Sequence, residues 1–262
     1  MDIGIRGRKA IINGGSAGLG YGAALALARE GVSLTIAARN AARLHDACAR
    51  IAKDSGVDVT PVTADHSTPA GRELILDACP EPDILVATCS PPPYTPDWRG
   101  ITSEDWRSGI ETGLLSPIEF TNAVVGGMIA RGWGRIVHIA TGAAKYPHVL
   151  RLLSGAPRAA LVNYAVAMAK VLAPHGVTIN TMLPVMHHTP GIRAIYEAQA
   201  QARGTSYDIE VARMVKEAPI PAGRFGDAED FGTLVAMFCS AQSNYVTGQS
   251  LVVDGGISNS IF

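Results

Sequence analysis

Short apolar runs alternate with longer helical patterns along the whole chain. The runs expected to form strands are Lys9–Asn13, Val32–Ala38, Val57–Ala64, Asp83–Thr88, Arg135–Ala140, Val177–Leu183 and Ser250–Val253. Helical patterns separate them at Gly18–Glu30, Asn40–Ser55, Ser67–Ala78, Leu114–Ala130, Pro157–Ala173 and Ala228–Ser240. The strand runs are continuously apolar, as in a parallel sheet covered by helices on both faces. The pattern therefore predicts an α/β fold with a doubly wound parallel sheet.

Two stretches break this alternation. Cys89–Gly100 contains three consecutive prolines, and Pro190–Ile220 is long and carries helical patterns of its own. Both follow predicted strands at their carboxyl ends, where open α/β sheets bind ligands. We interpret residues at about 190–220 as a lid over a substrate, with a rigid surface decoration as the alternative. Because no linker or repeat divides the chain, residues 1–262 are expected to form a single domain.

Composition narrows the class of protein. The chain has 262 residues, a formal net charge of −1 and 47% hydrophobic residues, which suffices for a large buried core. Near-neutral charge argues against a nucleic-acid partner. The four cysteines are scattered, which fits reduced thiols better than disulfides or a metal site. We find no signal-peptide pattern and no apolar stretch of membrane-spanning length. We therefore expect a soluble, cytoplasmic protein that acts on a small molecule.

A glycine-rich turn lies between the first predicted strand and helix. It runs N-G-G-S-A-G-L-G, from Asn13 through Ser16, Ala17 and Leu19 to Gly20. Glycines here permit a tight turn and let backbone N–H groups approach a pyrophosphate at the helix N-terminus. Its place at the first strand–helix crossover predicts a dinucleotide-binding site.

The turn and several later motifs resemble the short-chain dehydrogenase/reductase family. Gly14, Gly18 and Gly20 match the family's T-G-x-x-x-G-hydrophobic-G loop, with Asn13 in place of Thr. Further matches follow in the family's order at Asp83–Val86, Gly134–Val137, Gly223–Gly226, Tyr245–Gly248 and Val253–Gly256. The C-terminal half is similar to the 3-oxoacyl-[acyl-carrier-protein] reductase-like members. The resemblance covers nearly the whole chain and implies a Rossmann fold.

The resemblance also implies which residues hold the cofactor. Asp65 matches the family's adenine-contacting Asp, and we include its neighbour His66. Ala38 replaces the acidic residue that would bind the ribose of NAD, and Arg39 follows it, which favours the 2′-phosphate of NADP. Thr189 fits the family's Thr beside the carboxamide, although Val185 replaces the Gly of that motif. We expect NADP, with NAD the less favoured cofactor.

The family's catalytic Asn–Ser–Tyr–Lys set is largely replaced. Thr141 stands at the Ser position and keeps a hydroxyl, whereas Ser154 and Arg158 occupy the Tyr and Lys positions and Gly113 the Asn position. An aliphatic hydroxyl is far less acidic than a phenol, so Ser154 cannot replace the tyrosine chemically. Arg158 can still hydrogen-bond ribose hydroxyls, so cofactor binding is expected to survive.

Candidate replacements for the lost proton donor lie in neighbouring loops. Tyr146 and Lys145 follow Thr141 closely, and the others are Tyr94, His148, His187 and His188. The leading hypothesis is an NADP-dependent oxidoreductase that acts on a carbonyl/alcohol pair through a rearranged active site. The alternatives are a non-redox lyase, isomerase or cyclase on the same fold, and a non-catalytic NADP-binding subunit. Family members usually assemble through the two long helices and the C-terminal strand, so we expect a homotetramer or homodimer.

Overall fold

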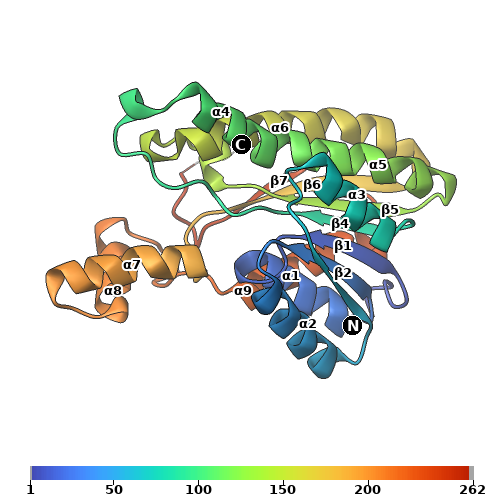
Figure 1. Ribbon diagram of the computed structural model, residues 1–262, viewed down its shortest axis with the longest axis horizontal. Coiled ribbons are helices and arrows are strands. Elements are labelled where there is room, and N and C mark those ends of the chain that lie inside the picture. Colours follow the sequence, from blue (N-terminus) through green and yellow to red (C-terminus); the bar gives the residue numbers. More distant parts are fainter. Residues whose placement is uncertain (1, 260–262) are drawn as a thin grey trace.

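The computed structural model describes residues 2–259, and the ends of the predicted 1–262 domain lie outside this range. Its central feature is a seven-stranded parallel sheet in the order β3-β2-β1-β4-β5-β6-β7 (Figure 1). The strands are β1 Lys9–Asn13, β2 Ser33–Ala38, β3 Val59–Thr63, β4 Ile84–Ala87, β5 Gly134–Ile139, β6 Val177–Pro184 and β7 Ser250–Val253. The doubly wound α/β prediction is confirmed.

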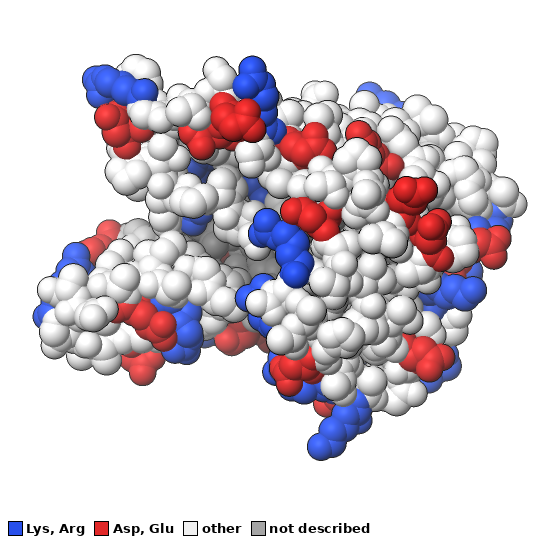
Figure 2. Space-filling view, in the orientation of Figure 1, with Lys and Arg blue, Asp and Glu red and all other residues white. Residues whose placement is uncertain are grey.

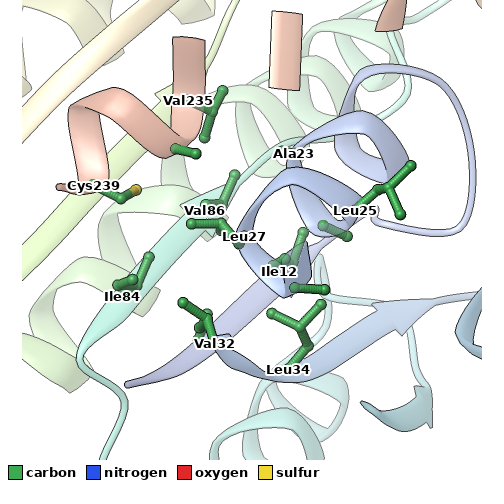
Figure 3. Close-up of a cluster of buried hydrophobic side chains, with 14 of the residues drawn as sticks. Ile12, Ala23, Leu25, Leu27, Val32, Leu34, Ile84, Val86, Val235 and Cys239 are labelled. Atoms are coloured by element: carbon green, nitrogen blue, oxygen red, sulfur yellow. The ribbon is translucent and has the colours of Figure 1, made fainter. Parts of the chain in front are cut away.

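Helices cover both faces of this sheet. The first group is α1 Gly18–Arg29, α2 Ala41–Ser55 and α9 Ala228–Cys239, and the second is α3 Pro69–Ala78, α5 Ser116–Ala130 and α6 Leu152–Leu172. Ile12, Leu27 and Val235 are among the buried side chains between the sheet and the first group (Figure 3). A second cluster around Ile136 and Phe120 joins the sheet to the second group. The sheet therefore has an apolar core on each face, which explains its continuously apolar strands.

Glycines allow α1 and α9 to pack in close contact. A Cβ added to Gly22 would lie 1.8 Å from the Ala228 carbonyl oxygen, and one added to Gly232 would lie 2.1 Å from the Gly22 oxygen. A side chain at either position would force the helices apart. This contact fixes the start of α1, on which the glycine-rich turn depends.

On the face of the sheet that α3, α5 and α6 cover, two helices begin at other residues than the sequence predicts. A polar helix, α4 Ser103–Ile110, was missed, although Thr102 and Asp105 form a capping box at its start. It continues through a π-helical turn, Glu111–Leu115, into α5. α6 begins at Leu152, five residues before the predicted start at Pro157, because the proline is accommodated inside the helix. Ser154 therefore lies on a helix and not in a loop.

The helix that runs from Ser103 to Ala130 corrects one further expectation. By length and composition alone it could cross a membrane, since an 18-residue window within it has a mean hydropathy of 1.2, and 39% of that window is buried. The residues it buries include Phe120, Val124 and Met128, which pack against the sheet. Its apolar character is thus explained by its place in the core.

The predicted lid consists of two helices that project from the body. α7 Pro190–Arg203 and α8 Tyr207–Glu217 form a separate arm in Figure 1. The arm has its own apolar cluster around Tyr196, Ile220 and Phe225. Glu210 is buried within the arm and accepts hydrogen bonds from Arg203, Arg213 and Thr205. The arm is therefore an internally packed unit attached after β6.

Candidate cofactor and substrate site

The glycine-rich turn after β1 has the backbone geometry of an anion-binding loop. Gly14 and Gly18 adopt left-handed backbone conformations, with φ values of 73° and 57°. A Cβ on Gly20 would lie 2.3 Å from the Gly14 carbonyl oxygen. Ala17 precedes α1 and gives no side-chain cap, so the first amides of α1 remain free to bind a ligand. The turn thus fits the pyrophosphate of a dinucleotide.

Two arginines flank the turn at the end of β2. The side chain of Arg39 is 69% exposed, and its Nη1 lies 3.8 Å from the Asp65 carboxylate. The Nε of Arg43, in the first turn of α2, lies 3.4 Å from the Ser16 hydroxyl oxygen, to which it donates. Arg43 was not among the predicted residues, because only the fold brings it to the turn. Together they place two guanidinium groups beside the expected adenosine end.

Asp65 and His66 lie beyond β3, next to these arginines. Burial raises the pKa of Asp65, but hydrogen bonds from Ser67 and the charge of Arg39 outweigh it and leave a net lowering. His66 bonds through Nδ1 to the Ser116 hydroxyl at 2.7 Å, and burial lowers its pKa. Asp65 is therefore ionised and His66 neutral near pH 7.

The loops after β5 and β6 lie at the same carboxyl edge of the sheet as Asp65 and His66, but further along it. Thr141 caps a short helical turn and accepts a hydrogen bond from the Ala143 amide at 3.4 Å. A Cβ on Gly142 would lie 2.5 Å from the Val185 side chain. Thr189 caps α7, and its side chain would lie 3.4 Å from a Cβ on Gly18. The base of the arm thus contacts the glycine-rich turn.

Arg158 and Ser154 lie one turn apart on α6 and are almost fully buried. The Arg158 Nη1 donates to the Ser154 hydroxyl oxygen at 2.9 Å, and Nη2 lies 2.7 Å from the Cys89 sulfur. Gly113, at the Asn position, is in the π-helical turn, and a Cβ there would lie 3.6 Å from the Arg158 Nη1. The structure therefore brings together Gly113, Ser154 and Arg158, the three positions at which the sequence predicts a changed catalytic residue.

Tyr146 and Lys145 lie on the exposed side of the Thr141 loop. Tyr146 is half-buried, and its amide donates to the Gly142 carbonyl at 2.9 Å. The Lys145 ammonium lies 5.9 Å from the centre of the Tyr146 ring. His148 is exposed and accepts the Leu150 amide at 3.2 Å. A phenol with a neighbouring cation is thus present just after Thr141.

The two adjacent histidines after β6 have different surroundings. His187 is buried against Phe231, and burial lowers its pKa to about 4, so it would exchange no proton near pH 7. His188 is half-buried, and its Nδ1 lies 2.7 Å from the Tyr207 hydroxyl on α8. The structure therefore removes His187 from the candidate proton donors.

A hollow separates the α7–α8 arm from the part of the molecule that carries α4, and Lys and Arg side chains are visible in its walls (Figure 2). In the proline-rich loop, the Tyr94 ring lies beneath the Arg151 guanidinium, 3.6 Å from the ring centre. Burial raises the pKa of Tyr196 to about 12, with the phenols of Tyr94 and Tyr207 adding to the effect. The loop and the arm therefore approach each other at the site.

Comparison with known proteins agrees with this geometry. A family model described as enoyl-(acyl carrier protein) reductase matches residues 14–258. Galactitol 2-dehydrogenase of Agrobacterium fabrum is 30% identical over 260 residues, which cover 96% of this chain and 98% of that protein. The 3-oxoacyl-[acyl-carrier-protein] reductase FabG of Vibrio cholerae is 27% identical over 255 residues, covering 97% and 98%.

A solved structure extends the likeness to the whole fold. The L-sorbose reductase of Gluconobacter frateurii, complexed with NADPH and L-sorbose, superposes with a TM-score of 0.93. It is 27% identical and covers 98% of each chain. The resemblance recognised in the glycine-rich turn and the C-terminal motifs is confirmed. The chain belongs to the short-chain dehydrogenase/reductase family of oxidoreductases.

Proposed function

We propose that this protein is an NADPH-dependent oxidoreductase that interconverts a carbonyl compound and its alcohol through a rearranged active site. The observation that carries the proposal is the pairing of an open, uncapped glycine-rich turn with Arg39 and Arg43 at its adenosine end. The NADPH complex of L-sorbose reductase, with nearly the same fold, supports it. A dinucleotide 2′-phosphate would give the exposed Arg39 an anion of higher charge than Asp65 offers.

The predicted cofactor residues are assigned to parts of this ligand. Backbone amides from Gly14 to Gly20, together with the Ser16 hydroxyl, would hold the phosphates, and Asp65 and His66 the adenine. Arg158 and Thr189 would hold the nicotinamide half. The bound cofactor supplies or accepts a hydride. Cofactor binding uses mainly backbone groups and arginines, and these are the groups that the chain retains.

Proton transfer requires a new assignment, because Ser154 is buried and holds Arg158. In our proposal Thr141 hydrogen-bonds the substrate oxygen, and Tyr146 donates the proton that this oxygen takes up. Lys145, above the ring of Tyr146, would stabilise the phenolate left behind. Ser154 then acts as a positioning residue for Arg158.

Two measurements test this function. NADPH should bind the wild-type protein in calorimetry, and Arg39→Asp should weaken NADPH about 100-fold while weakening NADH much less, because a repelled 2′-phosphate exists only in NADPH. Equal weakening of both nucleotides would contradict the 2′-phosphate assignment. Failure of the wild-type protein to bind either nucleotide would contradict the whole proposal.

Turnover distinguishes the reaction classes. With a panel of carbonyl compounds, NADPH consumption should accompany product formation, and Tyr146→Phe should lower kcat about 100-fold with unchanged NADPH affinity. Tyr164→Phe is the matched control, since its hydroxyl donates to Asn122 on α5. A changed substrate without NADPH consumption would favour a lyase, isomerase or cyclase. An unchanged kcat in Tyr146→Phe would exclude this tyrosine as the proton donor.

Assembly and location are part of the proposal. α6 exposes Val166 and Val171 at 39% and 58%, and the strand edge near β7 exposes Tyr245 at 98%. We propose that these surfaces join copies of the chain into a dimer or tetramer, which light scattering of wild type and Val171→Glu would test. The four cysteines are unpaired, as expected of a cytoplasmic protein.

A further inference from the structure

The segment that builds the reaction end of the site contains no acidic residue. Between Phe120 and Tyr196 there is neither Asp nor Glu, although the chain has 23 of them. The same segment carries Arg131, Arg135, Lys145, Arg151, Arg158, Lys170 and Arg193. It supplies β5, the Thr141 loop, α6, β6 and the start of the arm. The reaction end is therefore built from a segment that carries cations and no carboxylate.

Most arginines of this segment are compensated by the fold itself. Arg193 pairs with Glu197 at 3.1 Å, and Arg131 lies 3.8 Å from Asp83. Arg135 has no carboxylate partner but donates to three backbone carbonyls. Neither Arg151 nor Arg158 has a carboxylate of residues 2–259 within 4.0 Å. Arg158 is only 3% exposed and contacts a hydroxyl, a carbonyl and a sulfur. Arg151 and Arg158, which have neither a carboxylate partner nor the three carbonyl partners of Arg135, belong to the reaction end.

Arg151 is held in place against the proline-rich loop. Its guanidinium stacks on Tyr94, and the Thr95 amide donates to the Leu150 carbonyl at 3.2 Å, which fixes the proline-rich loop beside it. A planar guanidinium held by an aromatic ring presents its N–H groups in a fixed fork that matches a carboxylate. Burying a cation without an anion is costly, so ligand anions are favoured beside these two arginines.

We infer that the substrate is an oxo acid or the corresponding hydroxy acid, whose carboxylate binds Arg151 while its carbonyl lies at Thr141. The inference rests on the proposed oxidoreductase function and names its substrate class. The carboxylate takes no part in the reaction and leaves it unchanged. Arg158 supplies the second positive charge at this end, beside the nicotinamide half of the cofactor.

The test compares oxo acids that have one to four carbons between carboxylate and carbonyl with their methyl esters. With NADPH, wild-type kcat/KM for the preferred acid should exceed that for its ester at least tenfold. Arg151→Gln should lower kcat/KM for the acid about tenfold, mainly through KM, and leave the ester unaffected. Lys170→Gln, an exposed lysine of the same acid-free segment, should change neither.

A binding measurement keeps the inference testable without turnover. Calorimetry with the NADP-loaded protein should show the acids binding more tightly than the esters, and Arg151→Gln should abolish the difference. Esters that bind or react as well as acids would overturn the inference while leaving the oxidoreductase function intact. Reaction only with thioesters on an acidic carrier protein would also overturn it. Failure to bind any nicotinamide nucleotide would instead overturn the proposed function.

Discussion

Each end of the sheet buries an arginine that pairs with no carboxylate of residues 2–259, and the two ends treat that charge differently. At the amino end, Arg135 donates to the backbone carbonyls of Ser240, Gly134 and Gly176 and lies 4.5 Å from the Trp133 ring centre. At the carboxyl end, Arg158 contacts Ser154 and Cys89 beside the site. Arg135 donates to three backbone carbonyls, and in our proposal Arg158 binds a ligand. The comparison therefore sets a buried charge that serves the fold against one that we propose serves the cofactor.

The largest expected effect tests the cost of burying charge in this interior. Burial lowers the pKa of His138 and of His187 to about 4, below the value of about 6.5 in the unfolded chain. Between these values the unfolded state binds more protons, so stability is complete above pH 6.5 and falls as the pH drops towards 4. Each histidine should cost about 2 kcal/mol of folding free energy at pH 5.

Urea unfolding at pH 7 and pH 5 measures this loss. His187→Leu should reduce the loss between the two pH values by about 2 kcal/mol, since one buried histidine is then absent. His175→Gln is the control, because His175 is exposed at the end of α6. A wild-type protein that is equally stable at both pH values would show that the interior accepts protonated His138 and His187 at little cost. The cost of burying a charge could then not explain any difference between Arg135 and Arg158.

Arg135→Met should destabilise the protein by about 3 kcal/mol. The substitution removes the donor from three carbonyl oxygens near the amino ends of β5 and β6, and hydrogen bonds to charged groups are among the stronger ones in proteins. NADPH affinity should stay within about twofold of wild type, because the site lies at the other end of the sheet. A large loss of affinity in a stably folded variant would mean that the two ends are coupled.

The difference between the two ends also explains what could be predicted from sequence. The glycine-rich turn was identified because its function depends on backbone conformation, which Gly14, Gly18 and Gly20 specify directly. The strands were located for a similar reason, since burial on both faces requires continuous apolar runs. α4 was missed because it is short and polar, although its Thr102–Asp105 capping box was a readable signal.

Contacts between side chains far apart in sequence could not be predicted. Cys89, in the loop after β4, and Arg158, on α6, are separated by 69 positions in the sequence. Only the fold brings the Cys89 sulfur to within 2.7 Å of the Arg158 Nη2. The burial of His187 and the half-buried position of its neighbour His188 likewise depend on how the chain after β6 packs on Phe231 and Tyr207. Sequence placed these residues at the correct edge of the sheet without assigning their partners.

Arg158→Met gives the smallest effect on stability and tests the functional side of the comparison. Arg158 donates to a single backbone carbonyl, that of Ser154 at 3.4 Å, where Arg135 donates to three, so its removal should leave the free energy of unfolding within about 1 kcal/mol of wild type. NADPH affinity should nevertheless fall about tenfold, since the guanidinium would bind the nicotinamide half. Arg158→Lys should recover part of this affinity, because it restores a donor with positive charge. If Arg158→Met instead loses as much stability as Arg135→Met and binds NADPH normally, then both arginines serve the fold alone.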